Sequence, residues 1–433
     1  MFRQITLGRA QRGAAAVVAL SAISVAVIGA SSRSSTRPPE RVVSLGGVFA
    51  LSGSSANYGQ TARAAMEVAL EDVNRELGRN ALGLRFTATI EDSKRDPALA
   101  VAKARALRAR GVQLLIGGQT SAEVAPLKAY VDANGMLLVS PSSTAGSLAI
   151  AGDNVFRFTP SDSLEAVAIT TMLWDDGVRA VVPIWHDDPS GNDLVKAVRA
   201  RVTARGGLVS DGVRYGEPAD FSSPVAEARK QIDQAIDRYG REHVGIYYTG
   251  FDEVVRLFAV ASADPVLGSI RWYGSDAGAL PDELLARPVA ARFANRVGYP
   301  NPIVSLDADT RDHWQPILQR IRARSSVPAS GFDAYTLAVY DAVWVAAKAY
   351  VTVGASPTIA DLKQAFTSAA ATHFGATGWT ALNAAGDRKY GNFDFWAIRQ
   401  MDGALRWTRV AFYETRTERL VRFDDRGRVV SLR

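Results

Sequence analysis

The chain has 433 residues, of which 47% are hydrophobic, and this size and composition favour two compact domains over one large core or a disordered chain. It contains no cysteine, which excludes disulfides, thiol nucleophiles, cysteine-ligated metal sites and a lipid-modified N-terminal cysteine. The formal net charge is +6, but arginines in the first forty residues account for most of it, so the remainder carries about +2. Basic and acidic residues alternate along that remainder, so we expect no nucleic-acid partner.

The N-terminal segment has the pattern of an export signal. Residues 1–12 are polar and basic, residues 13–30 form an apolar run, and a polar stretch follows. The run approaches the roughly 18–20 apolar residues that span a bilayer, so an uncleaved anchor is the alternative. We predict a signal peptide or N-terminal anchor at 1–30 and a flexible linker at 31–40. The rest of the chain is then exported, periplasmic or at the cell surface, and touches the membrane only through an uncleaved N-terminus.

From Arg41 the sequence alternates short β-branched runs with longer helical patterns, which is typical of parallel βαβ units. A first set has predicted strands at 42–50, 84–90, 112–116, 136–140 and 155–158. The helix after its first strand carries an apolar stripe at helical spacing, formed by Ala62, Ala65, Met66, Ala69, Leu70 and Val73. Further helices are predicted at 97–110 and 122–133. Together these elements predict one doubly wound lobe.

A second set of elements repeats this organisation without obvious sequence identity. Its predicted strands are 180–185, 208–215, 244–248 and 271–273, with helices at 193–205 and 223–239. Beyond it we predict helices at 332–351 and 359–367, and strands near 393–398 and 405–413. The fold class is therefore α/β, with two Rossmann-like doubly wound lobes.

Small hydroxyl residues are concentrated in two loops of the first lobe. Ligands bind beyond the carboxyl ends of parallel strands, and the loops that follow two of these strands are GGQTS at 117–121 and SPSST at 140–144. The first leads into a helix whose N–H groups and positive dipole end favour an anion. The two loops therefore indicate a carboxylate site without lysine or arginine. The alternative is that these side chains only cap helices, as serine and threonine often do.

Loops of the second lobe carry acidic and aromatic residues. The predicted strands there are followed by 186–191 (HDDPSG), 248–253 (YTGFDE) and 273–276 (YGSD). The carboxylate of Asp276, placed opposite a carboxylate-binding loop, is what a zwitterionic amino acid requires, because each of its charged ends needs a partner when water is excluded. The alternative for Asp276 is a helix N-cap.

Signatures of catalysis and of metal or cofactor binding are missing from the sequence. The four histidines have no metal-ligand spacing, and there is no P-loop, G-x-G-x-x-G or G-x-S-x-G motif. His186 and Asp187 have the composition of a base and its orienting group, but a solvated loop pair fits them better. We expect no catalytic residue, no metal and no cofactor, and hence a binding protein rather than an enzyme.

Several short motifs occur in a characteristic order along the chain. They are VFALSG at 48–53 with Tyr58-Gly59, EDS at 91–93, IGG at 116–118, SPSST at 140–144, Phe156-Arg157 and GFDA at 331–334. Over roughly residues 41–413 the chain resembles the leucine/isoleucine/valine-binding protein family, the type I periplasmic solute-binding proteins of ABC importers. The resemblance implies two lobes joined by a hinge of three crossovers, with the ligand enclosed at the cleft.

The resemblance also implies how the chain is divided between the lobes. We expect residues 41–159 and 277–375 in the first lobe and residues 160–276 and 376–414 in the second. The arginine-rich segment 415–433 is expected to be a basic tail that frays.

Ligand-binding residues follow from the resemblance at matching positions. Ser121, Ser142 and Thr144 fall where the family binds the α-carboxylate of its ligand. Tyr58 falls at an aromatic position of the cleft, and Asp276 falls where an acidic residue pairs with the α-ammonium.

Two further positions depart from the family pattern. Ser190 and Phe251 stand where tyrosines are usual, and the smaller side chain of Ser190 indicates a larger or differently shaped ligand. The resemblance implies an exported protein that captures an amino acid or a related small polar ligand by hinge closure and delivers it to ABC importer permease subunits. The alternative is a sensory or regulatory module on the same fold, responsive to an amide or urea.

Overall fold

The computed structural model describes residues 40–53, 56–80, 82–216, 220–325 and 333–432. The predicted signal or anchor at 1–30, and all but the last residue of the predicted linker, lie outside these ranges. Within the described ranges, no helix combines the length and apolar character that crossing a bilayer demands.

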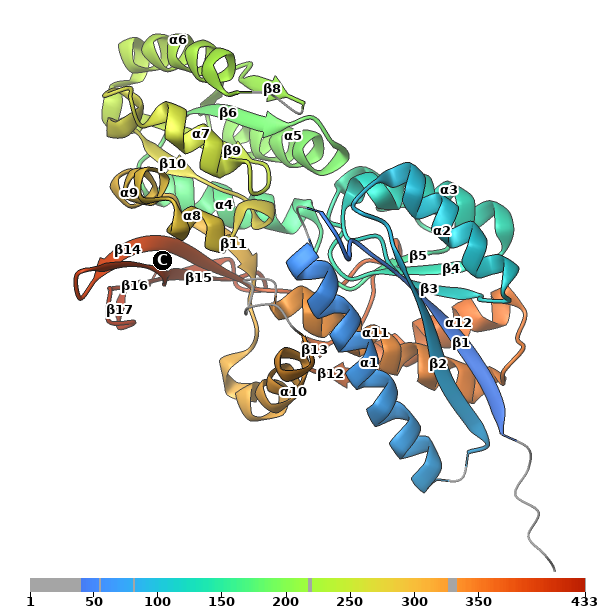
Figure 1. The fold of residues 1–433 in the computed structure, drawn as a ribbon. Coiled ribbons are helices and arrows are strands. Elements are labelled where there is room, and N and C mark those ends of the chain that lie inside the picture. The colour runs from blue at the N-terminus through green and yellow to red at the C-terminus, as the bar shows by residue number, and fades with distance from the viewer. Residues whose placement is uncertain (1–39, 54–55, 81, 217–219, 326–332, 433) are drawn as a thin grey trace, which may run out of the picture. The chain divides into compact units, whose positions relative to one another are not determined.

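The first lobe is built on five parallel strands in the order β2-β1-β3-β4-β5 (Figure 1). The strands are β1 (Arg41–Phe49), β2 (Leu84–Asp92), β3 (Leu114–Gly117), β4 (Leu137–Ser140) and β5 (Val155–Arg157). Helices packed with this sheet include α1 (Ala56–Arg79), α2 (Pro97–Ala109), α3 (Ser121–Asn134), α11 (Asp333–Val353) and α12 (Ile359–Thr372). All of β3 and β4 is buried because helices cover both faces. The five strands predicted for this lobe are confirmed.

The second lobe contains another parallel sheet, with the order β10-β9-β6-β7 and with β8 also paired to β6. Its strands are β6 (Ala180–His186), β7 (Leu208–Val209), β8 (Val213–Tyr215), β9 (Val244–Thr249) and β10 (Arg271–Tyr273). Helices of this lobe include α4 (Asp162–Asp175), α5 (Pro189–Ala204), α6 (Ser222–Tyr239), α7 (Val254–Ala261), α8 (Asp282–Ala286) and α9 (Pro288–Val297). Short 3₁₀ turns in the chain are η1 (Gly146–Leu148), η2 (Arg241–His243), η3 (Leu267–Ser269), η4 (Asp276–Gly278) and η5 (Ala308–Thr310).

The strand predicted at 208–215 is instead two short strands. β7 pairs with β6 at Ala180 and Val181, and β8 pairs with it from Ile184 onward. Pro183 lies between these two stretches and has no N–H to donate to a ladder, so the pairing is interrupted there.

A third sheet is antiparallel and extends to the end of the described chain. Its order is β11-β14-β15-β16-β17, with strands β11 (Asn301–Val304), β14 (Phe393–Met401), β15 (Ala404–Glu414), β16 (Arg419–Phe423) and β17 (Val429–Leu432). The expectation of a fraying tail from residue 415 was therefore wrong. Leu420 is buried, and the Arg422 guanidinium pairs with Asp175 at 2.6 Å and Asp176 at 2.8 Å at the end of α4. The arginine content of segment 415–433 suggested a solvated tail, but aspartates far away in the sequence pair with Arg422.

The packing of residues 282–304 also corrects the expected division between the lobes. Leu284 of α8 and Phe293 of α9 belong to the core of the second lobe, and β11 pairs with β14. The chain returns to the first lobe with α10 (Arg311–Arg324), whose Leu318 packs in the same core as α11 and α12. A short hairpin of β12 (Phe374–Gly375) and β13 (Gly378–Trp379) follows. An apolar helical pattern does not say which sheet the helix covers, so sequence alone misplaced this segment.

Candidate functional site

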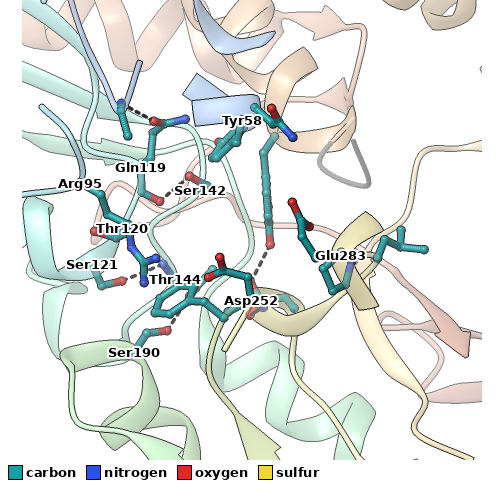
Figure 2. Close-up of a pocket in the computed structure, with 18 of the residues that line it drawn as sticks. Tyr58, Arg95, Gln119, Thr120, Ser121, Ser142, Thr144, Ser190, Asp252 and Glu283 are labelled. Atoms are coloured by element: carbon teal, nitrogen blue, oxygen red, sulfur yellow. Dashed lines mark hydrogen bonds between the residues drawn. The ribbon is translucent and has the colours of Figure 1, made fainter. Parts of the chain in front are cut away.

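A cavity of about 130 Å³ is lined by loops at the carboxyl ends of strands in both parallel sheets, as expected for open α/β sheets. Its volume is similar to the roughly 150 Å³ that admits a benzene-sized molecule in an engineered protein cavity. All seven residues singled out from the sequence line it, namely Tyr58, Ser121, Ser142, Thr144, Ser190, Phe251 and Asp276. The first five of these are labelled in Figure 2. The structure thus brings both predicted sets together, while their role in binding stays a prediction.

Two glycines let the first-lobe loops approach β1 closely. A side chain at Gly117 would place its Cβ 2.0 Å from the carbonyl oxygen of Val48, and the residue has φ +145°. A Cβ at Gly59 would lie 1.9 Å from the carbonyl oxygen of Ala50. This close approach allows the Ala50 N–H to donate to Oε1 of Gln119 at 2.7 Å. The start of α1, which carries Tyr58, and the loop after β3 are therefore fixed against the end of β1.

The hydroxyl groups of the two serine-rich loops join one loop to the other, mainly through backbone groups. Ser121 Oγ accepts the N–H groups of Thr144 at 3.3 Å and Ala145 at 3.1 Å and lies 3.0 Å from Ser143 Oγ. Ser142 Oγ donates to the carbonyl of Gln119 at 2.7 Å. These bonds lock the loop after β4 onto the start of α3. Ser121 and Ser142 hence shape the site as well as lining it.

The cap of α3 is supplied by another residue. Thr120 accepts the N–H of Glu123 and the Glu123 carboxylate accepts the N–H of Thr120, which is a complete capping box. The alternative interpretation of the hydroxyl residues as helix caps therefore holds for Thr120. Because Thr120 accepts the N–H of Glu123, the first-turn N–H groups that find no carbonyl partner within the helix are those of Ser121 and Ala122.

Thr144 connects the first lobe to the second. Its Oγ1 lies 3.1 Å from Oγ of Ser190, and Ser190 Oγ donates to Asp162 Oδ2 at 3.3 Å. The Asp162 N–H donates in turn to the Thr144 carbonyl at 2.9 Å. Burial, and next the charge of Asp276, hold the pKa of Asp162 well above its ordinary value. Beside the hydroxyls there is thus a carboxyl group that favours its neutral form.

Asp276 is the best-satisfied acidic group of the cavity. The Tyr335 hydroxyl donates to its Oδ2 at 2.6 Å, and the N–H of Ala277 donates to its Oδ1 at 2.7 Å. Its own N–H donates to Oε1 of Glu165 at 3.1 Å. Burial raises the pKa of both acids, but the hydrogen bonds from Tyr335 and Glu165 oppose the rise at Asp276, whereas the charge of Asp276 adds to the rise at Glu165. The rise in pKa is therefore larger at Glu165 than at Asp276, so Asp276 is the acid of the pair that ionises first.

Aromatic rings enclose the cavity from both lobes. The rings of Tyr58 and Tyr335 have centroids 6.2 Å apart, and both side chains are buried. From the second lobe, Phe251 presents its ring to the guanidinium of Arg95, whose Cζ lies 3.7 Å from the ring centroid.

Sequence reasoning missed several lining residues, among them Arg95, Leu280, Glu283 and Tyr335. Arg95 lies two residues after the EDS motif at the end of β2, and its position after a strand was a usable signal. Tyr335 lies in the first turn of α11, next to the GFDA motif. The apolar residues of this helix recur at helical spacing, and that pattern predicts packing in the core rather than a place in the cavity. Nothing in the sequence indicated that residues 280–283 line the cavity, and the expected division placed them in the first lobe.

Comparisons with known proteins extend over most of the chain. An uncharacterized protein of Methanocaldococcus jannaschii is 27% identical over 399 residues, which cover 88% of this chain and 92% of that protein. The Leu/Ile/Val/Thr-binding protein of Salmonella typhimurium is 30% identical over 188 residues, covering 42% of this chain and about half, 51%, of that protein.

Among solved structures, the fold matches the branched-chain amino acid transporter substrate-binding protein LivJ of Streptococcus pneumoniae in complex with isoleucine. The TM-score is 0.67, with 19% identity and coverage of 86% of this chain and 99% of that one, so this likeness concerns the fold. The family described as periplasmic binding protein matches residues 42–393. The family resemblance seen in the sequence is thereby confirmed, and the chain belongs to the periplasmic binding protein family, with its type I fold of two α/β lobes.

Proposed function

We propose that this protein is an exported solute-binding protein that captures an amino acid or a related small polar ligand and delivers it to an ABC importer. The observation that carries the proposal is the placement of hydroxyl and N–H donors from the first lobe and a buried carboxylate from the second around one cavity. A zwitterion needs both, since each of its charged ends loses hydration on enclosure.

The donor side suits the α-carboxylate of the ligand. Thr144 presents a hydroxyl, and the first turn of α3 adds N–H groups and the positive end of its dipole, while the Ser142 hydroxyl donates to the Gln119 carbonyl and shapes the loop. The Ser121 hydroxyl already accepts two N–H groups of the loop after β4, so its contribution is to hold that loop in position.

The acidic side suits the α-ammonium of the ligand. Asp276 is 5% exposed and has donors at both oxygens, and these hydrogen bonds oppose the rise that burial causes in the pKa of Asp276. A carboxylate oxygen accepts more than one hydrogen bond, so an ammonium group and the Tyr335 hydroxyl are compatible partners.

Capture would proceed by closure of the two lobes. Contacts that join the lobes include Thr144 with Ser190, Tyr335 with Asp276, and the Ser147 N–H donating to Asp193 Oδ2 at 2.7 Å. A ligand that bonds to both sides of the cavity stabilises the closed state over the open one through these differential contacts. Permease subunits would then recognise the closed surface, and no chemical turnover is required.

A thermal-shift screen of amino acids, amides and small carboxylates tests the proposal. A ligand that binds only the folded chain raises its Tm, and the Thr144→Val variant should lose most of that rise because it removes a hydroxyl donor. Thr352→Val is the matched control, since Thr352 is exposed on α11 and bonds only locally to Lys348. A Tm that stays constant with every amino acid would contradict the proposal.

A further inference from the structure

We infer that Arg95 and Asp252 together select the side chain of the ligand, and that they select a terminal carboxamide. This inference rests on the proposed function, because it concerns the same cavity. Arg95 and Asp252 would bind the ligand's side chain, whereas the hydroxyl loops and Asp276 would bind its α-carboxylate and α-ammonium.

Arg95 offers hydrogen-bond donors that the protein leaves unused. It is half-buried and lines the cavity, yet among the described residues no hydrogen bond or ion pair reaches its guanidinium. Its Cζ lies 3.7 Å from the centroid of the Phe251 ring, which is a cation–π contact. Such a contact uses the charge of the guanidinium and none of its N–H groups in hydrogen bonds, so they remain available for a planar acceptor.

The backbone at Arg95 is held in an unusual conformation. Lys94 and Arg95 have φ values of +54° and +62°, two consecutive non-glycine residues in the left-handed region. Such positions carry strain, and they persist where the surroundings or a function require them. Here the turn directs Arg95 toward the cavity from the end of β2, as Figure 2 shows.

Asp252 offers the complementary acceptor. It follows β9, directly after Phe251, and lines the same cavity. Within the described part of the chain, its carboxylate receives only the N–H of its own backbone. Burial raises the pKa of Asp252 and the positive charge of Arg95 opposes this rise, but no ion pair joins the two side chains in the described part of the chain. Arg95 and Asp252 therefore border one cavity, which Asp282 and Glu283 also line, without satisfying each other.

Four kinds of ligand side chain meet this pair differently. An alkyl group would bury both charges unpaired, which is unfavourable. A carboxylate would pair with Arg95 but be repelled by Asp252. An ammonium group would pair with Asp252 but be repelled by Arg95. A carboxamide has a carbonyl that accepts from Arg95 and an NH₂ group that donates to Asp252, so it alone satisfies both.

The test is calorimetric titration of the purified full-length chain with glutamine, glutamate, leucine and lysine. Glutamine should bind about tenfold or more tightly than each of the other three, because charge-assisted hydrogen bonds decide the difference. If leucine, glutamate or lysine binds as tightly as glutamine, the inference is wrong while amino-acid capture stands. If none of the four binds, the proposed function fails together with the inference.

A pair of variants isolates the role of Arg95. Arg95→Asn removes the guanidinium and keeps a residue that tolerates the left-handed region, so the preference for glutamine over leucine should disappear. Lys94→Asn makes the same change at the neighbouring strained position, whose side chain is exposed and does not line the cavity, and should keep the preference. Equal affinity of Arg95→Asn and the parent chain for glutamine would overturn the inference.

Asp252→Asn gives an independent readout should the Arg95 variant fold poorly. It removes the like charge that opposes an acidic ligand, so the ratio of glutamine to glutamate affinity should fall about tenfold. A ratio that does not change would overturn the inference.

Discussion

The Tyr335 hydroxyl on α11 donates a 2.6 Å hydrogen bond to Oδ2 of Asp276, the first residue after the β10 loop of the other lobe. Both side chains are buried, at 4% and 5% exposure. The carboxylate proposed to hold the ligand is thus also a contact that holds the lobes together. Ligand affinity and lobe closure should therefore change together when this contact is altered.

Tyr335→Phe should weaken ligand binding by about 1.5–3 kcal/mol, because it removes a hydrogen bond to a charged group and one of the contacts between the lobes. Calorimetric titration measures the loss. Tyr340→Phe is the control, because Tyr340 lies on the same helix and donates to Asp72 within the first lobe at 2.9 Å. It should leave affinity within the error of the titration, and an equal loss in both variants would remove Tyr335 from the closure mechanism.

Asp276→Asn should weaken amino-acid binding by about 3–5 kcal/mol, because an enclosed ammonium group would lose its charged partner. The measurement is again titration with the best ligand of the screen. Asp309→Asn changes an exposed aspartate on η5 and should bind as the parent does. Unchanged affinity of Asp276→Asn would show that the ammonium group binds elsewhere.

Asp387→Ala should lower the free energy of unfolding by about 3–5 kcal/mol, since it leaves the Arg157 guanidinium buried without its partner. The two side chains are 3% and 1% exposed and form two bonds, at 2.5 and 2.7 Å. Arg157 also donates to the Ala145 carbonyl at 2.6 Å, next to the loop that carries Thr144.

Urea unfolding measures the effect of Asp387→Ala, with Arg63→Ala as control. Arg63 pairs with Glu67 on the exposed face of α1, and such pairs contribute about 0.2–0.5 kcal/mol. Similar losses in the two variants would contradict a structural role for the buried pair.

Glu165→Gln should change how stability depends on pH. Burial, and next the charge of Asp276, hold the pKa of Glu165 well above its ordinary value of 4.5. The folded chain therefore keeps a proton that the unfolded chain releases above pH 4.5, so the contribution of Glu165 to stability is fully present below that pH and is lost as pH rises. Glutamine mimics the protonated acid, so the variant should gain stability relative to the parent between pH 5 and 8.

Urea unfolding at several pH values compares Glu165→Gln with Glu76→Gln, which changes an exposed residue of α1. The Glu76→Gln curve should run parallel to that of the parent chain. If the free energies of unfolding of Glu165→Gln and the parent differ by the same amount throughout this pH range, Glu165 is ionised in the folded protein.

The parallel sheets and the polar loops at the cavity could be predicted because both follow from local signals, whereas Tyr58, Ser190 and Phe251 were singled out through the family resemblance. Fully apolar runs such as those of β3 and β4 mark buried strands, and the polar residues directly after them mark the edge where ligands bind. Ser121, Thr144 and Asp276 were found in this way.

What the sequence did not predict depends on long-range contacts. The ion pairs of Arg422 with α4 stabilise a C-terminal strand that looked like a tail. Tyr335 points into the cavity from a helix whose pattern indicates only burial. The raised pKa of Glu165 comes from its burial and from the charge of Asp276, which lies beside it in the fold but 111 residues away in the chain.

The central claim is that one cavity binds both charged ends of an amino acid, and titration with three forms of the same amino acid tests it most directly. The free amino acid should bind, whereas its N-acetyl derivative, which lacks the ammonium group, and its methyl ester, which lacks the carboxylate, should each lose at least about 3 kcal/mol. Equal affinity for the free and the N-acetylated forms would contradict the account.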